Sequence, residues 1–222
     1  MTAATVDDSA AYVPFNERPY GGHERLLAFA GSPERVLDVG CSSGYLARRL
    51  VERGSTVVGL EADERAAEEA REVCEEVLVG DVETIELPFA EASFDVVLCG
   101  DVLEHLRDPE AFLKRVRPLL KPGGRLVLTT PNVANWAMRF GLLAGRWRYR
   151  DRGILDRTHA HLFTKKTLEE TLERAGYRIV AFDVTAPVPL VGNPRVERAA
   201  RAVARLRPSL LAYQFVLAAT PA

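Results

Sequence analysis

Short apolar runs alternate with amphipathic segments along the first 130 residues. The apolar runs predict five buried strands, at 36–39, 56–60, 77–79, 94–99 and 125–130. Helical spacing and stop signals predict helices between them, at 23–30, 45–53, 63–73 and 109–120. This alternation is typical of a parallel sheet covered by helices on both faces, and such a sheet binds its ligand beyond the carboxyl ends of the strands.

The pattern changes after residue 130. Residues 131–163 are rich in aromatic and arginine residues, and a helix capped by Thr164 follows, with Gly176 as its stop. Strands at 177–185 and 213–219 flank a basic amphipathic helix at 195–206. We therefore expect one domain over residues 1–222, with a flexible lead at 1–22, a core at 34–131, a lid insertion at 132–163 and a C-terminal part at 164–222.

Composition places the chain among ordinary globular proteins. Its 222 residues are 47% hydrophobic and 27% charged, with a net charge of −2, which argues against a disordered chain or a broad basic surface for nucleic acid. The three cysteines form no CxxC pair, so we expect reduced thiols and a cytoplasmic protein. Because no signal peptide is apparent and no apolar run reaches 18 residues, no membrane span is expected.

The strongest local signal is a glycine loop between the first strand and the next helix. It comprises residues 38–44, DVGCSSG, where small residues let the backbone approach a ligand. Glu61 ends the second strand, where a carboxylate can accept both hydroxyls of a ribose, and Asp81 follows the third, where it can accept from an adenine amino group. Together these residues predict a nucleoside site.

The loop does not fit two common nucleotide motifs. A dinucleotide fingerprint would need glycine at Ser42 and Tyr45, and no Gly-Lys-Ser/Thr ending is present. Instead, VLDVGCSSGYLARRL resembles the first motif of class I S-adenosylmethionine-dependent methyltransferases. The resemblance continues in order through GLEADERAAEEAR, GDVE, FDVVLCGDVLEHLRDPEAFL and LKPGGRLVLTTPN, over residues 34–131. GILDRTHAHLFTKKTLEETLERAGYRI is similar to the small-molecule branch that modifies quinones or sugars.

The resemblance implies a Rossmann-like, doubly wound α/β fold with a mostly parallel seven-stranded sheet and an antiparallel C-terminal edge hairpin. It also implies S-adenosylmethionine as the cofactor. The implied cofactor-binding residues are Asp38, Gly40, Ser42 and Gly44 for the methionine half, Glu61 for the ribose, Asp81 and Val82 for the adenine, and Gly100 beside Asp101 on the floor of the site. Ser42 stands where many members have glycine. We expect Glu61→Ala to weaken cofactor binding and leave the fold intact.

Methyl transfer to a hydroxyl benefits from a base, and histidine is the side chain best suited to that role at neutral pH. His159 is the first candidate because the related branch also has histidine there, and His105, close to the fourth strand, is the second. Asp101 completes the candidate catalytic set, although it can equally cap the following turn. His23 is expected at the surface. His159 and His161 stand two apart without a third ligand close in sequence, so no metal site is predicted.

The lid insertion has a local charge of about +4 and several aromatic residues. Trp136, Arg148 and Arg152 are the residues that we expect to bind an anionic, partly apolar acceptor. The alternative is a solvated face whose aromatic residues fill the lid's own small core. We do not expect nucleic acid to bind here, because no wider basic surface is present. For the 195–206 helix, a plain surface helix is favoured over contact with a membrane surface.

We therefore predict a methyltransferase that acts on a small molecule, with O-methylation of a sugar, a phenol or an anionic, lipid-linked intermediate as the first choice. A small-molecule N-methyltransferase would need no histidine base. A cofactor-binding regulatory subunit without turnover is the alternative from another class. The sequence names neither the acceptor nor the oligomeric state.

Overall fold

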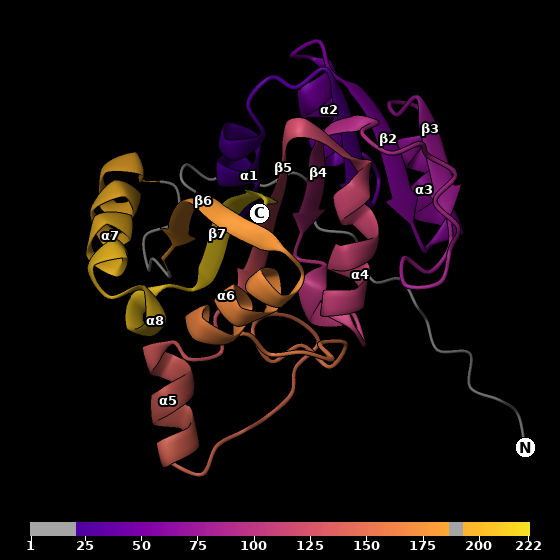
Figure 1. Cartoon of the computed structure of the whole chain (residues 1–222). Helices are drawn as coiled ribbons and strands as arrows, with labels where there is room; N and C mark the ends of the chain where they lie inside the picture. The colour runs from indigo at the N-terminus through magenta and orange to yellow at the C-terminus, as the bar shows by residue number, and fades with distance from the viewer. Residues whose placement is uncertain (1–20, 187–192) are drawn as a thin grey trace, which may run out of the picture.

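The computed structural model describes residues 21–186 and 193–222. Most of the flexible lead predicted at 1–22 therefore lies outside the described residues. A seven-stranded sheet in the order β3-β2-β1-β4-β5-β7-β6 forms the centre of the molecule (Figure 1). Its strands are β1 Arg35–Val39, β2 Thr56–Glu61, β3 Glu76–Val79, β4 Phe94–Gly100, β5 Leu120–Pro131, β6 Tyr177–Thr185 and β7 Gln214–Pro221.

The direction of each strand confirms the mostly parallel sheet. Strands β1 to β5 pair in parallel, whereas β7 runs antiparallel to both β5 and β6. The predicted edge hairpin is thus an antiparallel pair joined through helices rather than through a tight turn. The order reverses between β1 and β4, where Val39 lies beside Cys99, so the loops that begin at Gly40 and Gly100 leave the sheet side by side. Crevices of this kind bind ligands in α/β sheets.

Helices cover both faces of the sheet (Figure 1). On one face lie α1 Gly22–Ala30, α2 Tyr45–Val51 and α3 Glu64–Ala70, and on the other lie α4 Pro109–Val116 and α6 Lys165–Arg174. Neighbouring strand residues alternate between the faces, as Val96 and Val97 do. Both are fully buried, which explains why the strands read as continuous apolar runs.

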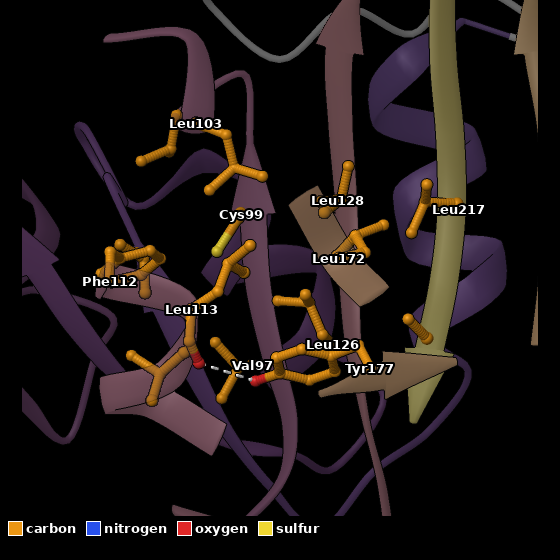
Figure 2. Packing of buried hydrophobic residues seen from close by; sticks show 14 of the residues in the cluster. Val97, Cys99, Leu103, Phe112, Leu113, Leu126, Leu128, Leu172, Tyr177 and Leu217 are labelled. Atoms are coloured by element: carbon orange, nitrogen blue, oxygen red, sulfur yellow. Dashed lines mark hydrogen bonds between the residues drawn. The ribbon is translucent and has the colours of Figure 1, made fainter. Parts of the chain in front are cut away.

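The face under α4 and α6 carries the larger of the two cores (Figure 2). Leu113 from α4 and Leu172 from α6 pack on strand residues there, in the same core as the ring of Tyr177. The Tyr177 hydroxyl donates to the Leu113 carbonyl at 3.2 Å. A buried tyrosine thus satisfies its polar end while its ring fills the core.

Helix α4 ends earlier than the sequence pattern predicted. We expected it to reach Leu120, but it ends at Val116, and a short 3₁₀ helix, η2 Arg117–Leu119, follows before β5 begins at Leu120. Pro118 is the physical reason, because it has no N–H to donate to the Lys114 carbonyl and so cannot continue the hydrogen bonds of the α-helix. Another 3₁₀ helix, η1 Leu103–His105, precedes α4.

The insertion after β5 contains one helix, α5 Trp136–Leu143. Asn135 caps it by accepting from the backbone of Ala137 and Met138, and none of its residues is buried. The ends of the segment meet where the Val133 N–H donates to the Phe163 carbonyl at 3.0 Å. Helix α5 therefore projects from a closed base, at the lower end of the view in Figure 1.

Two C-terminal helices, α7 Pro194–Leu206 and α8 Pro208–Leu211, connect β6 to β7. The sequence pattern did not predict α8, and it placed Val203 and Leu206 on an apolar side of α7. In the structure Glu197 and Ala204 face inward, while Val203 and Leu206 are 55% and 77% exposed. No helix in the described part of the chain is long and apolar enough to cross a membrane.

Candidate functional site

Two adjoining hollows open at the carboxyl ends of the parallel strands. They measure about 530 and 640 Å³, and both are lined by Gly40, Glu61, Gly100, Asp101 and His105. Ligand-binding clefts fall in this size range. The structure therefore brings residues from the ends of β1, β2 and β4 into one continuous site.

The glycine loop follows β1 in a conformation that requires small residues. Gly40 has φ 67°, and a Cβ placed there would lie 2.9 Å from Val102 Cγ2. Gly44, the residue before α2, has φ 75°, and a Cβ would lie 3.2 Å from the backbone of Ala70. Ser42 adopts the left-handed region at φ 51°, a conformation that costs a non-glycine residue about 1–2 kcal/mol. This strain explains why the position suits glycine, although serine is small enough to occupy it.

Glu61 holds this loop in place. One carboxylate oxygen accepts from the Ser42 N–H at 2.8 Å, and the other accepts from the N–H groups of Ala62 and Asp63 at 2.9 and 3.0 Å. The side chain is 8% exposed. The expectation that Glu61 can be removed without cost to the fold is therefore difficult to sustain, because removal would leave three backbone donors without their acceptor.

Two buried polar atoms beside the loop have no hydrogen-bond partner among the described residues. They are Asp38 Oδ2 and Ser42 Oγ. Burial, and next the charge of Glu61, raise the pKa of Asp38 to about 7. A buried polar atom without a partner is costly, so both atoms fit a polar ligand in the loop, such as the amino-acid end of the expected cofactor.

Asp81 and Val82 line the second hollow, between the ends of β3 and β4. The Asp81 carboxylate accepts from the Glu83 N–H at 2.9 Å. The Arg115 guanidinium, from α4, donates to the backbone carbonyls of Val82 and Glu83. These contacts fix the loop that would face an adenine ring, and Gly100 lines the same hollow.

Asp101 lies on the floor of the site, where both hollows meet. It is a non-glycine residue at φ 55°, and its two oxygens accept from Gln214 Nε2, each at 2.9 Å. Burial raises the pKa of Asp101, while hydrogen bonds to Thr129 and Gln214 and the nearby His159 act in the opposite direction. Strained residues of this kind are concentrated at functional sites.

His159 and His105 meet above this floor, although 54 residues separate them in sequence. Their ring centroids lie 4.8 Å apart, edge to face. His159 Nδ1 lies 3.1 Å from the Ile154 carbonyl. Because a carbonyl can only accept, Nδ1 carries the proton and Nε2 keeps its lone pair. Burial, and next the charge of His159, lower the pKa of His105.

Glu104 completes a cluster with the two histidines. Its Oε2 accepts from the Thr130 hydroxyl at 3.0 Å, and its Oε1 has no partner among the described residues. Burial, and next the charge of Asp101, raise the pKa of Glu104 well above the usual range. Ligand atoms of Glu104, His105 and His159 lie within 4.8 Å of one another, so this cluster could pass a proton or hold a divalent cation.

The sequence placed His161, and not Glu104, beside His159 as a possible metal ligand. His161 is directed elsewhere, because its Nε2 lies 2.8 Å from the Arg107 carbonyl and its ring stacks on Phe163. The two histidines of the HAH sequence therefore do not share a site.

Several residues of the site were missed by sequence reasoning. His23 was expected at the surface, but it lines the first hollow and stacks on Tyr45 at 4.8 Å. Burial lowers the pKa of His23. Tyr213 and Gln214 also line this hollow, from the start of the last strand, where the sequence carries no recognisable motif. Tyr45 follows the glycine loop directly and could have been found from that position.

The structure separates the lid residues that the sequence grouped together. Arg148 and Arg152 line a third hollow, of about 840 Å³, beside the site. Trp136 is 45% exposed and packs edge to face on Phe140. It does not line any of these three hollows, so a direct contact of Trp136 with the acceptor lacks support in this conformation.

The chain resembles known proteins in sequence. A family model for the methyltransferase domain matches residues 16–181. Ubiquinone biosynthesis O-methyltransferases are among the curated relatives. The protein from Idiomarina loihiensis is 36% identical over 115 residues, which are 47% of this chain and 46% of that protein. The protein from Cereibacter sphaeroides is 32% identical over 148 residues, which are 64% of this chain and 59% of that protein. The chain thus spans about half the length of the curated relatives it matches.

Solved structures show the same fold at low sequence identity. A methyltransferase from Thermotoga maritima, described as a possible histamine N-methyltransferase, has a TM-score of 0.64 at 21% identity and covers 92% of this chain and 90% of its own. A SAM-dependent methyltransferase from Archaeoglobus fulgidus also reaches 0.64, at 19% identity, over 89% and 91% of the two chains. The family model covers more than half of the chain, and the sheet order, the glycine loop and the strand-end carboxylates agree with it. The chain therefore belongs to the methyltransferase domain family, with the fold of the S-adenosylmethionine-dependent enzymes.

Proposed function

We propose that the chain transfers a methyl group from S-adenosylmethionine to a hydroxyl oxygen of a small molecule, with His159 as the general base. The observation that carries this proposal is the orientation of His159. Its Nδ1 is engaged by the Ile154 carbonyl at 3.1 Å, and the ring lines the first hollow beside Asp101 and His105. A lone pair on Nε2 is therefore available to an acceptor in that hollow.

The residues of the cofactor site support the same proposal. Asp38, Gly40, Ser42 and Gly44 would hold the methionine half, Glu61 the ribose, and Asp81 with Val82 the adenine. The partnerless oxygens of Asp38 and Ser42 favour this assignment. Gly100 lines both hollows, and a Cβ there would lie 3.0 Å from Leu26 Cδ1, so the strand packs closely on α1 at this position. The division into a core at 34–131 and a lid at 132–163 remains part of the proposal.

The cofactor supplies a sulfonium-bound methyl group whose S–C bond breaks as the new O–C bond forms. The bond's electron pair stays on the sulfur, so most of the catalysis is positioning of the acceptor in line with that bond. His159 takes the hydroxyl proton on Nε2. Asp101 is fixed by Gln214 at 2.9 Å, where it can orient the acceptor or the protonated ring.

The test is turnover of labelled cofactor with a panel of phenols, sugars and amines. His159→Ala should lower turnover on a hydroxyl acceptor by about 10²–10⁴-fold, with binding of S-adenosylhomocysteine unchanged by calorimetry. His161→Ala is the matched control, because that ring binds the Arg107 carbonyl outside the cluster. Full turnover of His159→Ala on its preferred acceptor would contradict the base assignment and favour an amine acceptor, for which positioning is sufficient. Cofactor binding with no turnover on any acceptor would favour a regulatory subunit.

A second mechanism is favoured by the arrangement of Glu104, His105 and His159, whose ligand atoms lie within 4.8 Å of one another. A divalent cation there would lower the pKa of the acceptor hydroxyl as a Lewis acid. Turnover that is abolished by a chelator and restored by Mg²⁺ or Zn²⁺ would identify this mechanism. Turnover unaffected by the chelator would leave His159 as the base.

The relatives favour a phenolic oxygen as the acceptor, because the two named above are ubiquinone biosynthesis O-methyltransferases. An anionic group on the acceptor is supported by the arginines of the lid. A cytoplasmic location fits the three buried thiols, none of which is in a disulfide.

A further inference from the structure

The third hollow, under α5, has a wall of arginines. Arg146, Arg148, Arg150 and Arg152 all line it, and they occupy every second position of a non-helical segment. Met138, Ile154 and Leu155 also line the hollow, so it has both a basic and an apolar part.

This hollow continues into the candidate active site. Gly153 and Tyr213 line both, and Gly153 directly follows the last of the four arginines. Backbone bonds close the loop that contains Gly153, with the Arg150 N–H on the Leu155 carbonyl at 2.8 Å and the Arg157 N–H on the Arg150 carbonyl at 3.0 Å. Six residues beyond Gly153 the same chain reaches His159. One ligand can therefore extend from the arginines to the base.

The charge of the arginine wall is not balanced within the hollow. None of its lining residues is acidic, and in the described parts of the chain no acidic side chain forms an ion pair with Arg146, Arg148 or Arg150. The acid of this segment that does pair, Asp151, is bound by Arg157 at 3.2 Å. Guanidinium groups form two-pronged hydrogen bonds to phosphate oxygens. Three guanidinium groups together exceed what a single carboxylate can satisfy, whereas a phosphate or diphosphate offers enough oxygens and charge.

We propose that this hollow binds a phosphate or diphosphate group of the acceptor, while the hydroxyl to be methylated reaches His159. The proposal rests on the proposed function for the placement of the reacting end. The acceptor class is thus a phosphate ester with an apolar portion that contacts Ile154 and Leu155.

Calorimetry with inorganic pyrophosphate tests the hollow directly, and S-adenosylhomocysteine tests the cofactor site in the same preparation. We expect the wild-type chain to bind pyrophosphate, and Arg148→Ala and Arg150→Ala each to weaken it about ten-fold, the worth of one charge-assisted contact. Arg65→Ala is the matched control, since Arg65 is an exposed arginine of α3 on another part of the surface. All variants should bind S-adenosylhomocysteine equally and should melt like the wild type, because these side chains are exposed.

The two binding readouts separate the two proposals. Absence of pyrophosphate binding, or equal binding by wild type and Arg148→Ala, overturns the phosphate site while leaving the proposed function in place. Absence of S-adenosylhomocysteine binding, with pyrophosphate still bound, overturns the proposed function instead. If pyrophosphate binds equally well with and without saturating acetate, the hollow is selective for phosphate over carboxylate. If acetate displaces all of the pyrophosphate, this selectivity is contradicted.

Vesicles distinguish a phosphate carried by a lipid from one carried by a soluble molecule. The wild-type chain is tested for binding to phosphatidylglycerol vesicles. If pyrophosphate releases the vesicles and Arg148→Ala does not bind them, the same guanidinium groups hold a phosphate carried by a lipid. Pyrophosphate binding without vesicle binding indicates a soluble phosphate ester. Vesicle binding that pyrophosphate does not release, in a chain that does not bind pyrophosphate, identifies a surface effect and overturns the proposal.

Discussion

At the scale of single residues, we predict that Asp38 makes cofactor binding depend on pH. Burial and the charge of Glu61 raise its pKa from 3.8 to about 7. Between about pH 4 and 7 the carboxyl group of Asp38 is therefore protonated in the folded protein and ionised in the unfolded chain. Its contribution to the free energy of unfolding falls as pH rises through that window. Burial favours the protonated form of Asp38. A cationic ammonium group beside Asp38 would favour the ionised form instead, because the two charges would pair.

We therefore predict that affinity for S-adenosylhomocysteine rises as pH increases from 5.5 to about 7 and then levels off. The slope should approach ten-fold per pH unit, because one proton must leave Asp38 when the ligand binds. Asp38→Asn should bind more weakly and lose the slope. Calorimetry in buffers of different ionisation enthalpy measures both the affinity and the released proton. An affinity that is flat with pH in the wild type would place the ammonium group elsewhere.

The sequence could predict site residues that are marked by a local motif at the end of a strand. Gly40, Gly44 and Glu61 stand at strand ends in a recognisable order, so their meeting at one edge of the sheet followed from the alternation of elements. Gln214 could not be predicted, because it reaches Asp101 across 113 residues and no local pattern marks it. Contacts of this kind depend on the antiparallel last strand.

At the scale of elements, Glu61 connects β2 to the glycine loop and to the start of α3. Glu61→Gln keeps the side-chain shape but replaces one acceptor oxygen with a donor that faces backbone N–H groups. We predict a loss of about 2 kcal/mol in the free energy of unfolding, the worth of charge-assisted hydrogen bonds, together with weaker cofactor binding. Denaturant titration measures the first effect and calorimetry the second.

Glu75→Gln is the control for that variant, because Glu75 forms an exposed ion pair with Arg35 and such pairs contribute little. Wild-type stability in Glu61→Gln, combined with weaker cofactor binding, would show that the carboxylate serves the ligand alone. Unchanged cofactor binding in a destabilised variant would show the opposite, a purely structural role.

The ends and faces of helices were harder to predict than their existence. Apolar spacing alone carried α4 to Leu120, but Pro118 decides its end. In α7 the apolar spacing placed Val203 on an apolar side of a surface helix and gave no sign that Arg201 faces inward, which it does because Asp183 on β6 is buried and requires cations. An ion pair with a residue distant in sequence can therefore decide which face of a helix is buried, against the pattern of its apolar residues.

At the scale of the whole molecule, the parallel direction of the first five strands follows from βαβ alternation, and the doubly wound arrangement was implied by the family resemblance. The position of α5 followed from neither. None of its residues is buried, so apolar periodicity could not show where it packs. The same segment contains the arginines that line the third hollow. The segment whose packing was hardest to predict from its sequence is therefore the segment proposed to select the acceptor.

Asp183 joins the N-terminal and C-terminal parts of the molecule. It is 2% exposed on β6 and accepts from Arg25 of α1 at 2.8 Å and from Arg201 of α7, whose Nε lies 2.9 Å away. Helix α1 also carries His23 into the first hollow. The ion pairs of Asp183 thus connect the edge of the sheet to a wall of the candidate site.

We predict that Asp183→Asn destabilises the protein by about 3 kcal/mol, because two largely buried guanidinium groups would lose their counter-charge. For a chain of this length that corresponds to a fall of about 10 °C in the melting temperature. Glu52→Gln, which disrupts the exposed pair with Arg49, should shift melting by only a degree or two. Calorimetric melting of both variants checks the difference. An equal, small shift in both would mean that α1 and α7 are held by apolar packing alone, and that water reaches the Asp183 cluster readily enough to replace its ion pairs.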